Sequence, residues 1–176
     1  MKLLMPRERL RRITEVTPAW LAERGLEGVV ADLDNTLVPY GAAPPPPAEL
    51  AAWRETLAAA GVPLAIVSNA KPGRIRTWAA ALEAPGSSFA AKPLPWCLRR
   101  MIARLGLAPA RVAVVGDQLF TDVLAANLVG AYAVLVDPLE PKRGLPHTRW
   151  VRGLEGWLLS RYFPKKGVHD RKAEGR

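Results

Sequence analysis

The chain has 176 residues, of which 49% are hydrophobic, enough to bury the core of one domain. Its single cysteine, Cys97, excludes a disulfide framework and a cysteine-based metal site. The net charge of +9 divides into +4 in residues 1–12, +7 in residues 142–176 and −2 between them. Basic ends of this kind indicate either a polyanionic partner or solubilising, frayed termini.

The sequence predicts neither a membrane-spanning segment nor an N-terminal signal peptide. No apolar run approaches the roughly 20 residues that a membrane-spanning helix needs. The apolar start, residues 1–5, is too short for a signal peptide and is followed at once by charged residues. We therefore expect a cytoplasmic protein, and peripheral contact with the inner face of the membrane is an open alternative.

Apolar runs alternate with helical patterns along the chain, which predicts an α/β fold with a five-stranded parallel sheet and flanking helices. In chain order, we expect a strand at 28–33, a proline-rich connector at 44–47, a helix at 48–60, a strand at 63–68, a helix carrying Ile75, Trp78 and Leu82, a strand at 88–91, a helix at 96–105, a strand at 111–115, a helix at 121–128, a strand at 132–136 and an amphipathic segment at 148–162. Residues 1–163 are expected to form a single domain, and residues 164–176 a basic tail.

Polar residues follow four of the expected strands. They are Asp32 and Asp34 after the first strand, Ser68 and Asn69 after the second, Lys92 after the third, and Asp117 and Asp122 after the fourth. Open parallel sheets place their ligands at the carboxyl ends of the strands. A single such residue is weak evidence, but four groups in this order predict one catalytic site.

Phosphoryl transfer is the chemistry that fits these residue types. Asp32 can attack phosphorus to form an aspartyl-phosphate, and Asp34 can protonate the leaving oxygen and then deprotonate water. Grouped carboxylates require a hard cation, and Mg²⁺ fits, with Asp32, Asp117 and a backbone carbonyl as ligands. Ser68 can donate a hydrogen bond to a phosphoryl oxygen, and Lys92 can stabilise the negative charge of the transition state.

These residues stand in segments that resemble the four motifs of the haloacid dehalogenase (HAD) superfamily. The segments are Asp-Leu-Asp-Asn-Thr-Leu at 32–37, Ser-Asn at 68–69, Ala-Lys-Pro at 91–93 and Gly-Asp-Gln-Leu-Phe-Thr-Asp at 116–122. The whole chain up to about residue 163 is similar to the YqeG-type phosphatases of HAD subclass IIIA.

The resemblance implies a Rossmann-like HAD fold and a role for each residue. Asp32 is expected to be the nucleophile, Asp34 the acid/base that also gives its carbonyl to the metal, and Asp117 a metal ligand. Asp122 is expected to support the metal shell or Lys92, and a simple place in the first turn of a helix is its alternative. Asn69 stands beside Ser68 as a supporting residue.

The spacing of the motifs leaves no room for a cap domain over the site. Only 30 residues separate Leu37 from Ser68, and 23 separate Ser68 from Lys92, so the expected helices and strand use them up. An open site suits a phosphate on a large body, and the basic ends favour a lipid at an anionic membrane surface. The YqeG type is similar to mitochondrial phosphatidylglycerophosphate phosphatases, which makes that lipid the candidate substrate.

A protein of another class is the alternative. It would keep the HAD fold but act by docking on RNA or a ribonucleoprotein through its basic ends. No RNA-binding motif is present, and the catalytic set is complete. Turnover discriminates the two functions, because a pure binding protein should not release phosphate.

Overall fold

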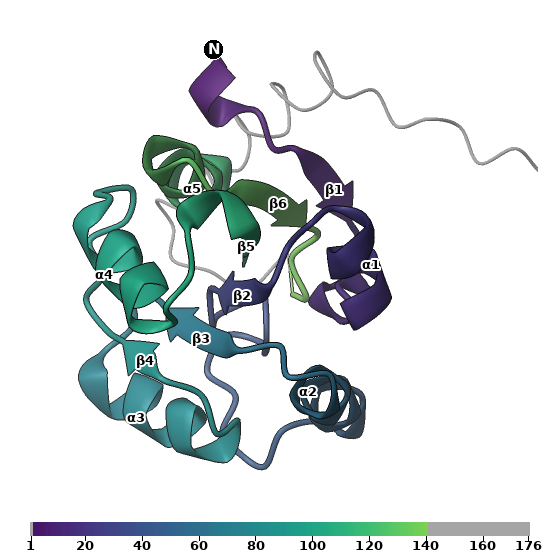
Figure 1. Ribbon diagram of the computed structural model, residues 1–176. Helices are drawn as coiled ribbons and strands as arrows, with labels where there is room; N and C mark the ends of the chain where they lie inside the picture. Colours follow the sequence, from purple (N-terminus) through teal and green to yellow (C-terminus); the bar gives the residue numbers. More distant parts are fainter. Residues whose placement is uncertain (1, 141–176) are drawn as a thin grey trace, which may run out of the picture. The chain divides into compact units, whose positions relative to one another are not determined.

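The computed structural model describes residues 2–140, which form an α/β unit on a six-stranded, all-parallel sheet (Figure 1). The strands are β1 (Glu8–Leu10), β2 (Gly28–Ala31), β3 (Leu64–Val67), β4 (Gly86–Ser87), β5 (Val112–Gly116) and β6 (Tyr132–Val136). The α-helices are α1 (Pro18–Glu23), α2 (Ala48–Ala59), α3 (Pro72–Ala81), α4 (Trp96–Arg104) and α5 (Leu124–Val129). Short 3₁₀ turns lie at Lys2–Leu4, Ile13–Glu15 and Pro109–Arg111, and a π-helical turn at Leu119–Val123.

The sheet runs in the order β1-β6-β5-β2-β3-β4, so β2 lies between β3 and β5. Every residue of β2, β3 and β5 is buried, as expected for parallel strands covered on both faces. Val30 pairs with Ala65 of β3 and with Val114 of β5. The end of β2 is therefore a central point at the carboxyl edge, between the ends of the two strands that carry the later motifs.

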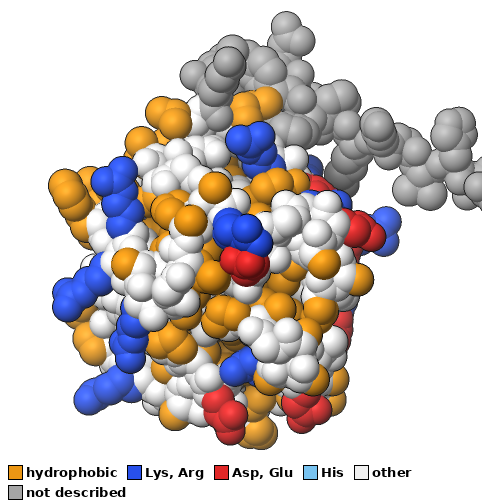
Figure 2. Space-filling view, viewed as in Figure 1, with side chains coloured by type: hydrophobic (Ala, Val, Ile, Leu, Met, Phe, Trp, Pro, Cys, Tyr) orange, Lys and Arg blue, Asp and Glu red, His pale blue; other side chains and the backbone are white. Residues whose placement is uncertain are grey.

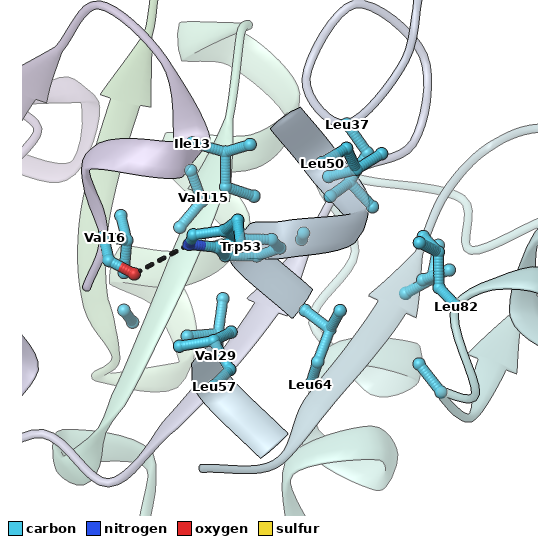
Figure 3. Close-up of a cluster of buried hydrophobic side chains, with 14 of the residues drawn as sticks. Ile13, Val16, Val29, Leu37, Leu50, Trp53, Leu57, Leu64, Leu82 and Val115 are labelled. Carbon is cyan, nitrogen blue, oxygen red and sulfur yellow. Dashed lines mark hydrogen bonds between the residues drawn. The ribbon is translucent and has the colours of Figure 1, made fainter. Parts of the chain in front are cut away.

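Alternate residues of the strands face two helical layers. A continuous core cluster takes Val29 and Ala31 from β2, with side chains from α1, α2 and α3, on one face. In this cluster the indole Nε1 of Trp53 donates a 2.9 Å hydrogen bond to the carbonyl of Val16, so the buried indole is satisfied (Figure 3). Helices α4 and α5 lie on the other side of the sheet (Figure 1).

The structure confirms the parallel α/β fold and corrects three local predictions. The sheet has six strands rather than five, because residues 8–10 form an unexpected edge strand against β6. The third expected strand lies at β4, Gly86–Ser87, rather than at 88–91, which is irregular. The helix expected at 121–128 begins instead as the π-helical turn and continues as α5.

The region between the motifs contains no cap domain, as the spacing predicted. Only a loop, α2 and β3 lie between Leu37 and Ser68, and only α3 and β4 lie between Ser68 and Lys92. Within residues 2–140, no helix combines the length and the apolar composition that crossing a bilayer requires. The amphipathic segment at 148–162, the domain end at 163 and the basic tail lie outside the described residues.

Candidate active site

Asp32 lies directly after the central strand, and its position is fixed by the sheet. Its backbone N–H donates a 2.9 Å hydrogen bond to the carbonyl of Val115 on β5. The chain then turns tightly: Asn35 has a φ of 64°, and its N–H donates to the carbonyl of Val38 at 2.7 Å. Asn is among the residues that adopt this left-handed conformation most readily. The turn holds Asp32 and Asp34 at the carboxyl edge of the sheet.

Lys92 joins two of the predicted carboxylates. Its Nζ lies 2.6 Å from Oδ1 of Asp32 and 2.5 Å from Oδ1 of Asp122. The three side chains are only 6%, 9% and 4% exposed, respectively. Removing such groups from water is costly unless their charges are compensated, and this arrangement compensates them. The structure thus brings together residues that are 60 and 30 positions apart in the sequence.

Burial and charge act in opposite directions on this cluster. Burial alone would lower the pKa of the Lys92 ammonium, but the negative charges of Asp122 and Asp32 outweigh it and raise the pKa. For Asp122, burial is the largest effect and raises the pKa to about 6, although Lys92 acts in the opposite direction. Lys92 therefore stays protonated and can supply a fixed positive charge at the nucleophile.

Gly116 makes room for Asp122. A Cβ atom at position 116 would lie 2.2 Å from Cγ of Asp122, a distance that no packed side chain tolerates. The π-helical turn brings Asp122 back over the strand end, where its Oδ2 accepts a 3.2 Å hydrogen bond from the N–H of Gln118. The glycine before Asp117 is thus required by close packing against the carboxylate that holds Lys92.

Three buried carboxylates converge where a metal was expected. Oxygen atoms of Asp32, Asp117 and Asp122 all lie within 4.8 Å of one another. Hard oxygen donors at this spacing fit a divalent cation such as Mg²⁺. Because Oδ1 of Asp122 binds Lys92 and its Oδ2 binds Gln118, this carboxylate is positioned to support the lysine. Asp32 and Asp117 remain the side chains that can hold the ion, with the backbone carbonyl of Asp34 as the expected third ligand.

Ser68 and Asn69 occupy the end of β3 beside this cluster. Ser68 is buried, and its Oγ accepts a 3.3 Å hydrogen bond from the N–H of Ala70. Asn69 holds the backbone of Lys92: its Oδ1 accepts from the N–H at 2.9 Å, and its Nδ2 donates to the carbonyl at 3.4 Å. The structure therefore gives Asn69 a concrete supporting role, which is to fix the loop that carries the lysine.

Arg74 is a site residue that sequence reasoning missed. Its Nε and Nη2 donate to Oδ1 of Asp34 at 3.0 and 2.6 Å, and its guanidinium also reaches the carbonyls of Pro39 and Ala42. Burial is the largest effect on Asp34 and raises its pKa, whereas the Arg74 guanidinium acts in the opposite direction. The only signal in the sequence was a basic residue in the first turn of the helix after Ser68.

Comparison with known proteins places this geometry in a family. A model of the haloacid dehalogenase-like hydrolases matches residues 15–130. The chain is 35% identical to a protein described as probable phosphatase YqeG of Bacillus subtilis over 159 residues, which cover 90% of this chain and 91% of that protein.

Two further similarities agree with this assignment. The chain is 32% identical to phosphatidylglycerophosphate phosphatase 1 of Arabidopsis thaliana over 154 residues, covering 82% of this chain and 44% of the plant protein. Among solved structures, the cobalt-bound deoxy-D-mannose-octulosonate 8-phosphate phosphatase YrbI of Haemophilus influenzae aligns with a TM-score of 0.51 and 14% identity over 63% of this chain and 68% of that one, which shows a shared fold. The chain therefore belongs to the haloacid dehalogenase-like hydrolases and is related to the YqeG type.

Proposed function

We propose that the protein hydrolyses phosphomonoesters through an aspartyl-phosphate on Asp32, with Mg²⁺ as the cofactor. The observation that carries the proposal is the buried ion pair of Lys92 with Asp32 and Asp122, next to Asp117. A lysine that touches the nucleophile can neutralise the charge that develops on a transferring phosphoryl group. The same lysine contacts Oδ1 of Asp32 and holds this carboxylate in place for attack.

The reaction has two steps. In the first, a carboxylate oxygen of Asp32 forms a bond to phosphorus, the bond from phosphorus to the ester oxygen breaks, and Asp34 donates its proton to that leaving oxygen. In the second, Asp34 accepts a proton from water, the water oxygen bonds to phosphorus, and the bond to Asp32 breaks to release phosphate. Ser68 would donate a hydrogen bond to a phosphoryl oxygen, while Asn69 holds the Lys92 backbone.

To carry out these proton transfers, Asp34 must either leave its ion pair with Arg74 or keep the pair through Oδ1 and transfer the proton through its other carboxyl oxygen. Burial favours its protonated form and the guanidinium favours its carboxylate, so the two influences oppose each other at the group that must cycle between both states. When bound by Asp32, Asp117 and the Asp34 carbonyl, Mg²⁺ would supply neutralisation of the phosphate charge and alignment with the nucleophile.

The test of the reaction is phosphate release from an aryl phosphate. Asp32→Asn should abolish turnover, and Asp137→Asn, at a carboxylate outside the site, should leave it unchanged. EDTA should abolish turnover and Mg²⁺ should restore it. Independently of activity, Mg²⁺ should raise the melting temperature of the wild type more than that of Asp117→Asn or Asp32→Asn, since each variant loses a carboxylate that can hold the ion. Turnover by Asp32→Asn would exclude the covalent mechanism.

For the physiological substrate, we propose a phosphate on a lipid, with phosphatidylglycerophosphate as the specific candidate. An uncapped site encloses a small ligand poorly and must draw binding energy from what surrounds the phosphate. The absence of a cap between Leu37 and Lys92 in the described chain supports a substrate that is presented on a larger surface. The similarity to the plant phosphatidylglycerophosphate phosphatase supports this choice of headgroup.

Substrate preference tests the lipid assignment separately from the chemistry. Phosphatidylglycerophosphate in bilayers should be hydrolysed much faster than soluble glycerol phosphate at equal phosphate concentration. A screen that adds sugar phosphates, nucleotides and phosphopeptides covers the other classes. Comparable rates on the lipid and on glycerol phosphate would leave the phosphatase intact and remove the lipid assignment.

A further inference from the structure

The segment that carries Lys92 also exposes three large apolar side chains. Phe89, Leu94 and Trp96 have exposed fractions of 66%, 53% and 71%, and they are half of the six exposed large hydrophobic residues in the described part of the chain. Single exposed apolar residues are common on soluble proteins, but three within eight positions form a cluster that indicates contact with another molecule. These three residues are called the rim patch below.

The rim patch lies at the mouth of the site. Phe89 and Leu94 follow β4, and Trp96 is the first residue of α4, so all three stand at the carboxyl edge of the parallel sheet. The segment is attached to the end of β3, because the N–H of Phe89 donates to the carbonyl of Ala70 at 3.3 Å. A surface that meets the rim patch is therefore also presented to Lys92 and Asp32.

The backbone of the segment adopts an unfavourable conformation at two residues. φ is 45° at Phe89 and 50° at Ala91, in the left-handed region that a bulky residue rarely enters. Between them Ala90 is buried, and its N–H donates to the carbonyl of Ser68 at 3.2 Å. Such strain persists where the surrounding structure enforces it, and here it coincides with an aromatic ring exposed to solvent.

Charge is divided unevenly over the described unit. Residues 56–116 contain eight Lys and Arg residues and one acid, Glu83, whereas residues 13–55 and 117–140 contain two Arg residues and eleven acids. Lys and Arg side chains gather on the side of α3 and α4, and most of the visible acids lie toward α1 and α2 (Figure 2). The rim patch belongs to the cationic part, which includes the exposed side chains of Lys71, Arg99 and Arg100.

The N-terminal basic segment, by contrast, is largely committed to the fold. Its apolar residues Ile13 and Val16 are buried in the core, and β1 pairs with β6. Arg9 forms an ion pair with Asp137, and Arg12 forms one with Glu49. Leu3, Arg7 and Arg11 are exposed in this segment, but Leu3 is its single exposed large apolar side chain among the described residues, so the segment offers a membrane less apolar surface than the rim patch does.

We propose that the rim patch inserts into the headgroup region of an anionic lipid bilayer and holds the active site against it. Aromatic and leucine side chains beside basic ones match the boundary between lipid headgroups and acyl chains, and Lys71, Arg99 and Arg100 can contact lipid phosphates. The proposal rests on the lipid substrate proposed above. It assigns membrane contact to the catalytic rim rather than to the N-terminal end of the chain.

Vesicle co-sedimentation with full-length protein tests the apolar contact. Leu94→Ser/Trp96→Ser should bind vesicles of phosphatidylcholine with phosphatidylglycerol about tenfold more weakly than the wild type. Leu128→Ser, an exposed leucine in the last turn of α5, is the matched control and should bind as the wild type does. Hydrolysis of a soluble aryl phosphate should be unchanged in both variants, which shows that the fold and the catalytic residues are intact.

Two reversals of charge test the electrostatic contact. Lys71→Glu should weaken binding to the anionic vesicles, and the loss should shrink as salt is added. Arg11→Glu makes the same change of charge at an exposed residue of the N-terminal segment and should have a smaller effect. Vesicles of phosphatidylcholine alone should bind the wild type much more weakly than anionic vesicles.

The outcomes separate docking from substrate. Docking by the rim would be overturned if Leu94→Ser/Trp96→Ser bound vesicles as well as the wild type or the Leu128→Ser control does. Docking on a membrane would also be overturned if the rim variants bound RNA more weakly than the wild type but bound vesicles equally well. If the rim variants lose vesicle binding but the wild type does not hydrolyse phosphatidylglycerophosphate in bilayers, docking stands and the substrate assignment falls. If that lipid is hydrolysed equally by wild type and rim variants, the substrate assignment stands and docking falls.

Discussion

Replacing Lys92 with methionine is expected to destabilise the fold as well as stop the reaction. Methionine keeps most of the side-chain volume but removes the positive charge. The substitution leaves the carboxylates of Asp32 and Asp122 buried without the ammonium that both of them contact. Breaking a buried ion pair from one side costs about 3–5 kcal/mol, because the remaining charge is left uncompensated. That is a large share of the roughly 5–15 kcal/mol that holds a typical domain together.

The size of the effect can be separated from lost packing by removing one of the stranded charges. Lys92→Met/Asp122→Asn should recover at least about 1 kcal/mol relative to the single variant, since one buried charge is gone. Asparagine keeps an oxygen that can accept the hydrogen bond from the N–H of Gln118. Both variants should be inactive, so stability rather than turnover distinguishes them.

Urea unfolding followed by circular dichroism, with EDTA present so that bound metal does not contribute, is the appropriate measurement. Lys71→Met is the matched control, because Lys71 is exposed, and it should change stability by less than about 0.5 kcal/mol. A cost below about 1 kcal/mol for Lys92→Met, or a double variant less stable than the single one, would refute the view that this lysine compensates two buried carboxylates.

Three further substitutions test the rest of the site. Arg74→Ala should lower kcat about 10-fold or more for phosphates with poor leaving groups, because Asp34 loses the side chain that orients it. The loss should be smaller for aryl phosphates, which need less protonation of the leaving group. Arg76→Ala, at an exposed residue of the same helix, is the control and should change neither rate. Asp34→Asn should slow turnover about 10²–10⁴-fold with the same dependence on leaving group, and equal losses for all leaving groups would restrict Asp34 to shaping the metal site. Gly116→Ala should lower the free energy of unfolding in urea by about 1–3 kcal/mol and remove activity, because the Cβ of the new alanine would overlap Asp122. Retained activity would show that Asp122 can move without consequence.

The sequence predicted the parts of the fold that depend on apolar pattern. The last strand, 132–136, was placed correctly because it is a short continuous apolar run. The helix from Ala48 was placed to within one residue at its end, because its buried residues Leu50, Trp53 and Leu57 recur at helical spacing. The edge strand β1 was missed. Two of its three residues are charged, and its stability comes from backbone pairing with β6, which side-chain pattern does not report. β4 was misplaced because Gly86 and Ser87 have low strand propensity.

The residues of the candidate site likewise divide into those that the sequence pattern could locate and those that it could not. Asp32, Ser68 and Asp117 were predicted because each comes directly after a strand, and parallel strands bring their carboxyl ends to one edge. Lys92 was predicted by the same rule, although β4 ends five residues before it. Arg74 could not be placed in the same way. Its contact with Asp34 depends on how residues 35–42 fold back over the start of α3, as its bonds to the carbonyls in that loop show. Long-range loop packing of this kind leaves no periodic signature in a single sequence.

The pairing of β1 with β6 also has a consequence for how the chain folds during synthesis. Glu8 pairs with Val134 and Leu10 with Val136, so β1 is synthesised well before β6, the strand with which it pairs. Contacts between such distant residues form late, because the entropy of closing the long intervening loop must be met first. Until then β5 is an open edge with unpaired backbone groups, the kind of surface on which nascent chains associate wrongly. A chain that stops before residue 132 would keep that edge permanently, and we expect it to aggregate rather than to persist as a smaller soluble phosphatase.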